Sequence, residues 1–167
     1  MAAPARYVSS TFGFAVEYPL TAQPTSQDSR SVQWTGDGQE GVGPWGIKLQ
    51  GEMANSRTPQ QLVDALQQST FAGATVVFNI TGATIGYTDA YGNIYDQIVS
   101  PQGGLLRHER LLIEAAVRDG IAVELVAYSD FAPDKSFHPE PAQLVSWVEG
   151  YGDIFGNSVT WQGEPQL

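Results

Sequence analysis

The sequence contains no cysteine and few basic residues. Eight Lys and Arg stand against 18 Asp and Glu, which gives a formal net charge of -10. The lack of cysteine excludes disulfides, thiolate zinc sites and thiol nucleophiles. The lack of clustered Lys and Arg argues against nucleic acid and anionic membranes as partners. A basic protein or a cation is an electrostatically easier partner for such a chain.

Long apolar runs are also lacking. No stretch of about 18 apolar residues occurs, so we expect no membrane span. Residues 1–6, Met-Ala-Ala-Pro-Ala-Arg, carry no apolar signal core. Two alternatives stay open: a cytosolic protein, or an exported or lipid-anchored protein whose signal lies outside this sequence. The localisation is therefore left unknown.

Motifs for catalysis and for cofactors are lacking as well. The two histidines, His108 and His138, have no metal-binding spacing, and we expect both at the surface. Ser158 does not lie in a G-x-S-x-G turn. The glycine-rich loop from Gly36 to Gly43 lacks the Lys-Ser/Thr ending of a phosphate loop. We therefore predict no catalytic residue, no metal ligand and no cofactor.

What the chain does have is enough apolar material for a core. Its 167 residues suit one domain, over 1–167, and 42% of them are hydrophobic. A chain of this size buries about 70% of its unfolded surface on folding. The core therefore needs no disulfide or metal to hold it.

The most informative segment runs from Arg107 to Asp130. Two apolar-alternating runs meet there at Asp119-Gly120, a dipeptide that favours a tight type I′ turn. We predict a long antiparallel hairpin with one buried face. Its apolar rows would be Leu111, Ile113, Ala115 and Val117 on the first strand and Ile121, Val123, Leu125 and Ala127 on the second.

Two helices are predicted beside this hairpin. Thr58, Pro59 and Gln61 form the start signal of the first, which Gly73 ends. Leu144, Val148, Tyr151 and Phe155 recur at helical spacing in the second, although Gly150 and Gly152 weaken it by about 1 kcal/mol each. Further strands are expected at 12–18, 31–35, 45–50, 75–79, 84–88, 94–99 and 157–161.

The predicted order is β-β-β-α-β-β-β-β-β-α-β. Mostly antiparallel strands with segregated helices are typical of the α+β class, here an antiparallel sheet with helices packed on it. The helices must bury their apolar stripes on a sheet, and the hairpin supplies one.

Both ends of the chain resemble a known family. The segment Phe14-Ala15-Val16-Glu17-Tyr18-Pro19 is similar to the opening strand of PsbP-like proteins, and Asp153 to Val159 is similar to their closing helix-to-strand step. That family shares its fold with the Ran-binding Mog family and with many bacterial lipoproteins. The resemblance implies a PsbP-like α/β sandwich and a non-enzymatic role as an accessory subunit or lipoprotein that binds another protein.

Four residues are candidates for binding. Asp89 and Asp96 lie on either side of Gly92, Asp89 at the start of the predicted loop Asp89 to Asn93 and Asp96 three residues after its end. Such a loop could offer oxygen ligands to calcium, although the spacing departs from that of an EF-hand. Trp45, at a loop edge, and Tyr91, in that loop, could line a pocket or a docking surface. Packing in the core and a plain hairpin loop are the structural alternatives for these residues.

Two functions follow from these candidates. The first is a non-enzymatic protein-binding or accessory module that docks through its loops. The second is a small-ligand or divalent-cation binding protein with an aromatic-lined pocket, for which a weak cation site is one form. Neither the partner nor the ligand can be named from the sequence.

Overall fold

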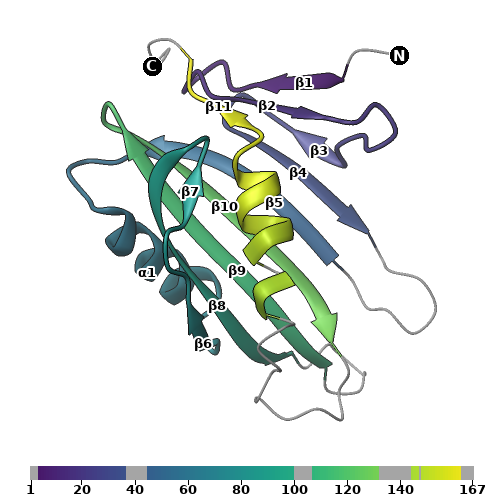
Figure 1. The fold of residues 1–167 in the computed structure, drawn as a ribbon, viewed down its shortest axis with the longest axis vertical. Coiled ribbons are helices and arrows are strands. Elements are labelled where there is room, and N and C mark those ends of the chain that lie inside the picture. The colour runs from purple at the N-terminus through teal and green to yellow at the C-terminus, as the bar shows by residue number, and fades with distance from the viewer. Residues whose placement is uncertain (1–3, 37–44, 100–106, 132–143, 147, 163–167) are drawn as a thin grey trace.

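The computed structural model describes residues 4–36, 45–99, 107–131, 144–146 and 148–162. Its main sheet has eight strands and is antiparallel throughout the order β3-β4-β5-β10-β9-β8-β6, with β7 paired to β8. A three-stranded sheet, β1-β2-β11, lies at one end of the molecule (Figure 1). The strands are β1 (Ala5–Val8), β2 (Ala15–Tyr18), β3 (Ser26–Gln27), β4 (Ser31–Gly36), β5 (Trp45–Met53), β6 (Thr75–Asn79), β7 (Thr84–Ile85), β8 (Thr88–Val99), β9 (Arg107–Arg118), β10 (Ile121–Phe131) and β11 (Val159–Thr160).

Two helices cover opposite faces of the main sheet. The α-helix α1 (Pro59–Thr70) packs against β8 and β9 on one face. The second helix, η1 (Val148–Phe155), crosses the other face in front of the strands (Figure 1). The predicted α+β class is therefore confirmed. No helix in the described part of the chain is long and apolar enough to cross a membrane.

The hairpin β9–β10 is at the centre of the sheet, and its turn has the predicted form. Asp119 and Gly120 have φ of 53° and 79°, as a type I′ turn requires. The prediction of one buried face is wrong, because paired residues of a two-residue hairpin lie on the same face. Leu111 pairs with Tyr128 and Leu125 with Glu114, so the two predicted apolar rows lie on opposite faces.

Both faces of the hairpin are consequently buried in separate clusters. Leu112, Ala116, Val123, Leu125 and Ala127 pack toward η1 and the small sheet. Leu111, Ile113, Ala115, Ala122 and Val126 pack toward α1. A sheet buried on both faces reads as nearly continuous apolar sequence rather than as alternation. The runs Leu111–Ile113 and Leu125–Ala127 carry that signal.

The turn of the second hairpin lies earlier in the chain than the sequence predicts. Residues 84–88 are not one strand, because Gly86 and Tyr87, with φ of 56° and 61°, form a two-residue turn between β7 and β8. The predicted loop from Asp89 to Asn93 is wrong, since these residues continue into β8. Gly92 and Asn93 read as a turn pair in the sequence, but pairing with β9 holds them extended.

The first predicted strand is shorter than expected. Only Ala15–Tyr18 is extended, while Ser9 to Phe14 form a turn in which the Gly13 amide donates to the Ser9 carbonyl over 2.8 Å. Phe12 and Phe14 are still buried, so these apolar residues indicate burial in the core and not a strand. The strand β1, which pairs with β2, was not predicted.

The predicted second helix makes the expected apolar contacts with the core, but its type differs from the prediction. Leu144 is buried, and Val148, Tyr151 and Phe155 pack on the core, as the spacing indicates. Val148–Phe155 is a π-helix rather than an α-helix. Two glycines and the wide turn of this helix make it a weak element by itself, so packing on the sheet must hold it.

The start of α1 offers a test of how far local signals stabilise the fold. Thr58 Oγ1 accepts a hydrogen bond from the backbone N–H of Gln61, and Gln61 Oε1 accepts one from the backbone N–H of Thr58. These two bonds form the predicted capping box. We expect Thr58→Ala to lower the free energy of unfolding by about 1 kcal/mol. Urea denaturation followed by circular dichroism measures this, with Gln60→Ala, on the exposed first turn, as the matched control. Equal stability of the two variants would contradict a role for the box.

Candidate functional site

The structure does not bring the four predicted binding residues together. Trp45 and Asp96 face the η1 side of the sheet, whereas Asp89 and Tyr91 face the α1 side. The pairings Trp45–Ser129–Arg110–Asp96 put Trp45 and Asp96 three strands apart, which corresponds to about 14 Å at the usual strand spacing. The binding roles of these residues stay predictions, but they do not form one site.

Asp96 is engaged in an ion pair inside the protein. The Arg110 Nε and Nη2 atoms donate to its two carboxylate oxygens over 2.8 and 3.0 Å, and the Asp96 side chain is 0% exposed. Asp89, in contrast, is exposed on the other face. No group of three acidic or histidine residues able to hold a metal occurs in the described ranges. The oxygen-rich calcium loop that the sequence suggested is absent here, because its residues form a strand.

The two aromatic candidates are partly used for packing. Trp45 is half-buried against the core, and its indole lies over Gly36, where a Cβ would collide with the ring. Tyr91 is half-buried beside the α1 cluster. Its hydroxyl accepts from Asn93 Nδ2 over 3.4 Å, and the same amide donates to the Tyr95 hydroxyl over 3.0 Å.

Two other candidates from the sequence, Ser158 and His108, lie next to or on strands of the structure. Ser158 lies between η1 and β11, where its hydroxyl donates to the Phe155 carbonyl, as a strand-start hydroxyl would. His108 is half-buried on β9. His138 and the loop residues 37–43 lie outside the described residues.

A cavity of about 100 Å³ lies beside Phe12 and Trp161. This volume is small compared with the several hundred Å³ of typical ligand pockets.

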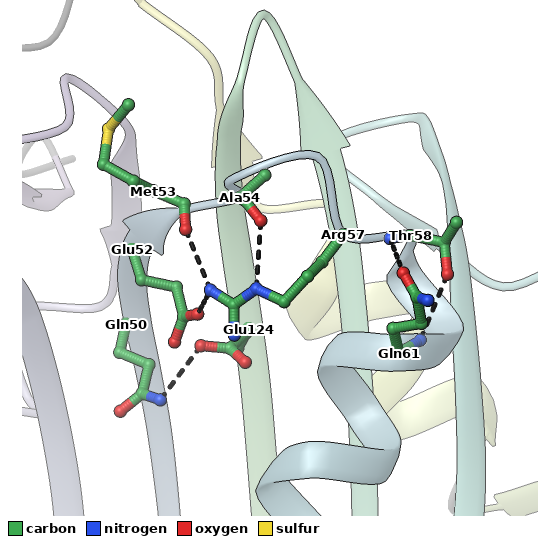
Figure 2. Close-up of polar contacts among 8 residues, drawn as sticks. All are labelled: Gln50, Glu52, Met53, Ala54, Arg57, Thr58, Gln61 and Glu124. Carbon is green, nitrogen blue, oxygen red and sulfur yellow. Dashed lines mark hydrogen bonds and ion pairs between the residues drawn. The ribbon is translucent and has the colours of Figure 1, made fainter.

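Another group of polar residues, absent from the sequence predictions, lies on the α1 side of the sheet. We call it the polar cluster: Gln50 and Glu52 on β5, Glu124 on β10 and Arg57 before α1 (Figure 2). Gln50 pairs with Glu124 and Glu52 with Ala122, so the three β-strand side chains share one face. α1 packs on β8 and β9, and the cluster lies next to its first turn.

The turn between β5 and α1 positions Arg57 in this cluster. Asn55 and Ser56 have φ of 52° and 65°, a left-handed conformation that non-glycine residues rarely adopt. The Arg57 Nε donates to the Ala54 carbonyl over 3.0 Å and Nη2 donates to the Met53 carbonyl over 2.9 Å. Nη2 also forms an ion pair with Glu52 (Figure 2). The strained turn therefore holds a guanidinium beside two carboxyl groups.

Glu124 is the buried member of the cluster. Its side chain is 2% exposed, and Oε1 accepts a hydrogen bond from Gln50 Nε2 over 3.1 Å. Burial raises the pKa of Glu124 to about 7, against the effect of the Gln50 hydrogen bond, and the negative Glu52 adds to the rise while Arg57 opposes it. The carboxyl group thus changes its charge near neutral pH. Glu52 and Arg57 are about one third exposed and connect Glu124 to the surface.

A sequence signal for the buried acids existed. Glu114 and Glu124 each interrupt an apolar run of the hairpin, Leu111–Val117 and Ile121–Ala127. A charged residue inside a run that is buried on both faces must itself be buried. Recognising both faces as buried would have found Glu124. Nothing in the sequence indicates that Arg57 and Gln50 lie beside it.

Comparison with known proteins identifies the fold. The sequence matches no family model and no curated protein. The structure is similar to that of the Ran-binding protein Mog1p of Saccharomyces cerevisiae, with a TM-score of 0.59, 8% identity and 96% of each chain covered. A Mog1 point mutant gives a TM-score of 0.60 at 9% identity, with 96% of this chain and 97% of that chain covered. The fold shared with the Mog family, as the sequence resemblance implied, is confirmed.

A third similar structure is the cyanobacterial PsbP of Synechocystis. It has a TM-score of 0.49 and 13% identity, with 96% of this chain and 94% of that chain covered.

The buried ion pair gives a prediction that separates structural from binding roles. Asp96→Ala leaves the buried Arg110 guanidinium without its bidentate carboxylate, so we expect it to lower the free energy of unfolding by about 3–5 kcal/mol. Asp89→Ala, a matched change at an exposed position seven residues earlier, is expected to change it by less than about 0.5 kcal/mol. Chemical denaturation measures both. A destabilisation by Asp89→Ala as large as that by Asp96→Ala would refute this assignment.

Proposed function

We propose that this protein is a non-enzymatic module that binds another protein through the polar cluster on the α1 side of its sheet. The observation that carries the proposal is Glu124, a carboxyl group 2% exposed that accepts a hydrogen bond from Gln50 beside the Arg57–Glu52 ion pair. Strongly perturbed acids next to a specific charged partner are concentrated at functional sites. The fold shared with Mog1p, a protein whose name describes it as Ran-binding, supports a binding role.

The position of the cluster supports docking of a folded partner. α1 packs mainly over β8 and β9, while β5 and β10 carry half-buried polar side chains on the same face: Lys48, Gln50, Glu52 and Tyr128. Partly exposed polar side chains are typical of the rim of a non-obligate interface, and Tyr128 is of an aromatic type that is enriched in such interfaces. The left-handed backbone at Asn55 and Ser56 fixes the edge of this surface before any partner arrives.

The charges of the cluster favour a basic group on the partner. Arg57 forms an ion pair with Glu52, so the single guanidinium is already engaged. Glu124 then has the Gln50 amide as its hydrogen-bond donor. A Lys or Arg side chain inserted beside Glu124 would complete the neutralisation of two carboxyl groups by two cations. The net charge of -10 attracts such a partner at long range.

The test uses a partner isolated by affinity capture with the wild-type protein. Binding of the purified partner is then measured by calorimetry for the wild type, Glu124→Gln and Gln50→Ala. We expect each substitution to weaken binding about tenfold or more, because each removes part of a desolvated charge interaction. Wild-type affinity should rise as the pH rises through 7, since Glu124 ionises there, and Glu124→Gln should abolish that pH dependence.

The matched control is Glu17→Gln, the same chemical change at an exposed position of β2 in the other sheet. It should bind as the wild type does at every pH. If Glu124→Gln and Glu17→Gln bind alike, the docking surface lies elsewhere, and Trp45, Tyr91 and Asp89 become the next positions to test. If the wild-type protein retains no partner, the protein-binding proposal itself fails.

A further inference from the structure

A second acid of the hairpin lies buried under η1. Glu114 on β9 pairs with Leu125 and faces the η1 side, and its side chain is 0% exposed. Neither carboxylate oxygen has a hydrogen-bond donor among the described residues. Burying an ionised carboxylate without a partner is very unfavourable, so such a group takes up a proton instead. Burial, with the negative Asp153 adding to it, raises the pKa of Glu114 to about 8.

Two glycines make the room that the Glu114 side chain occupies. A methyl group on Gly152 would lie 2.8 Å from Glu114 Oε1, and one on Gly92 would lie 2.5 Å from its Cγ. A methyl group on Gly156 would lie 3.7 Å from Oε2, an ordinary van der Waals distance. The backbone of η1 therefore rests on the Glu114 side chain at Gly152, and Gly156, just after the helix, lies beside it.

The helix that rests on Glu114 is intrinsically weak. It contains Gly150 and Gly152, and its turns have the wide π form. Its apolar side chains hold it to the sheet, including Phe155, whose ring meets that of Trp34 edge-on at 5.5 Å. Small changes in the free energy that holds η1 on the sheet can therefore shift the equilibrium between the attached and the detached helix.

The C-terminal end of η1 is tied down separately. The Gly156 carbonyl accepts from the Gly86 amide over 2.9 Å. Asn157 Oδ1 accepts from the Tyr87 amide over 2.9 Å and from Thr84 Oγ1 over 3.0 Å. These bonds to the β7–β8 turn fix one end of the helix. Movement of residues 148–155 would pivot on this attachment.

No positive charge offsets Glu114 from the described elements around it. η1 contributes Asp153, the residues that pair with Glu114 on β8 and β10 are Gly92 and Leu125, and β7 brings the Thr84 carbonyl close to Gly156. On β9 itself, Arg110 lies four residues away and binds Asp96. Ionisation of Glu114 would thus place an uncompensated charge under the helix, next to Asp153.

We propose that η1 is a pH-sensitive cover, seated on the sheet while Glu114 is protonated and released, about its attachment at Asn157, when Glu114 ionises. Release would uncover the apolar face formed by Trp34, Leu112 and Leu125. The device separates a closed form, favoured in acidic solution, from an open form that a rise in pH populates.

The pH dependence of helix release follows from the difference between the Glu114 pKa in the closed state and its ordinary value. The folded pKa of Glu114, about 8, lies above its ordinary value of 4.5. The closed state therefore binds the proton more tightly, and its advantage is fully present below pH 4.5 and is lost as the pH rises to about 8. The ratio of open to closed helix should rise by up to tenfold per pH unit in this window and level off above it.

Amide hydrogen exchange, measured residue by residue by NMR between pH 5 and 8 and corrected for the intrinsic rate, tests this. We expect the protection factors of residues 148–155 in the wild type to fall by up to tenfold per pH unit, while those of α1 fall less. Glu114→Gln, which keeps the shape without the charge, should hold the η1 protection constant. Glu114→Met provides a second neutral side chain of similar length if the amide disturbs folding.

Two further variants make the result specific. Glu149→Gln removes one charge from an exposed position of the same helix and should retain the wild-type pH dependence. Asp153→Asn should make the fall in protection level off at a lower pH, because the Asp153 charge adds to the rise in the Glu114 pKa. The proposal is overturned if η1 protection does not depend on pH, if the neutral variants behave as the wild type, or if α1 and η1 lose protection together as in global unfolding.

Discussion

The burial of both faces of the β9–β10 hairpin is the constraint on which the rest of the structure depends. A sheet with two apolar faces needs two covering layers, and α1 and η1 supply them on opposite sides. Every polar side chain on these two strands must then be paired, neutralised or placed at a strand end. The Asp96–Arg110 pair and the two buried glutamates are direct consequences of this requirement.

The two glutamates show how one constraint gives two different outcomes. Glu114 and Glu124 are on neighbouring rungs of the hairpin, paired with Leu125 and Ala115, and point to opposite faces. Glu124 meets Gln50, Glu52 and Arg57, and its pKa rises to about 7. Glu114 meets glycine backbone and Asp153, and its pKa rises to about 8. A polar environment turns the first into a candidate contact for a partner, and a glycine-lined one turns the second into a candidate control of η1.

Parts of this arrangement were predictable because they depend on local chemistry. Asp119-Gly120 indicated the type I′ turn, Thr58 and Gln61 indicated the capping box, and the spacing of Val148, Tyr151 and Phe155 indicated the face that η1 buries. The misplaced elements are those in which tertiary pairing overrode local preference. Gly92-Asn93 has a turn composition but is held extended by β9, and Thr84 to Thr88 turns back at Gly86-Tyr87 although it is rich in strand-forming residues.

By itself the sequence determined the fold class, the central hairpin with its turn, the start of α1 and the acidic character of the chain. Each of these depends on residues within a few positions of one another. Only the tertiary structure decided which faces are covered, that Trp45 and Asp96 lie on one face and Asp89 and Tyr91 on the other, and that Arg57 reaches Glu52. The reason is physical: the environment of a side chain, and hence its charge, is set by neighbours from distant strands, which no local pattern specifies.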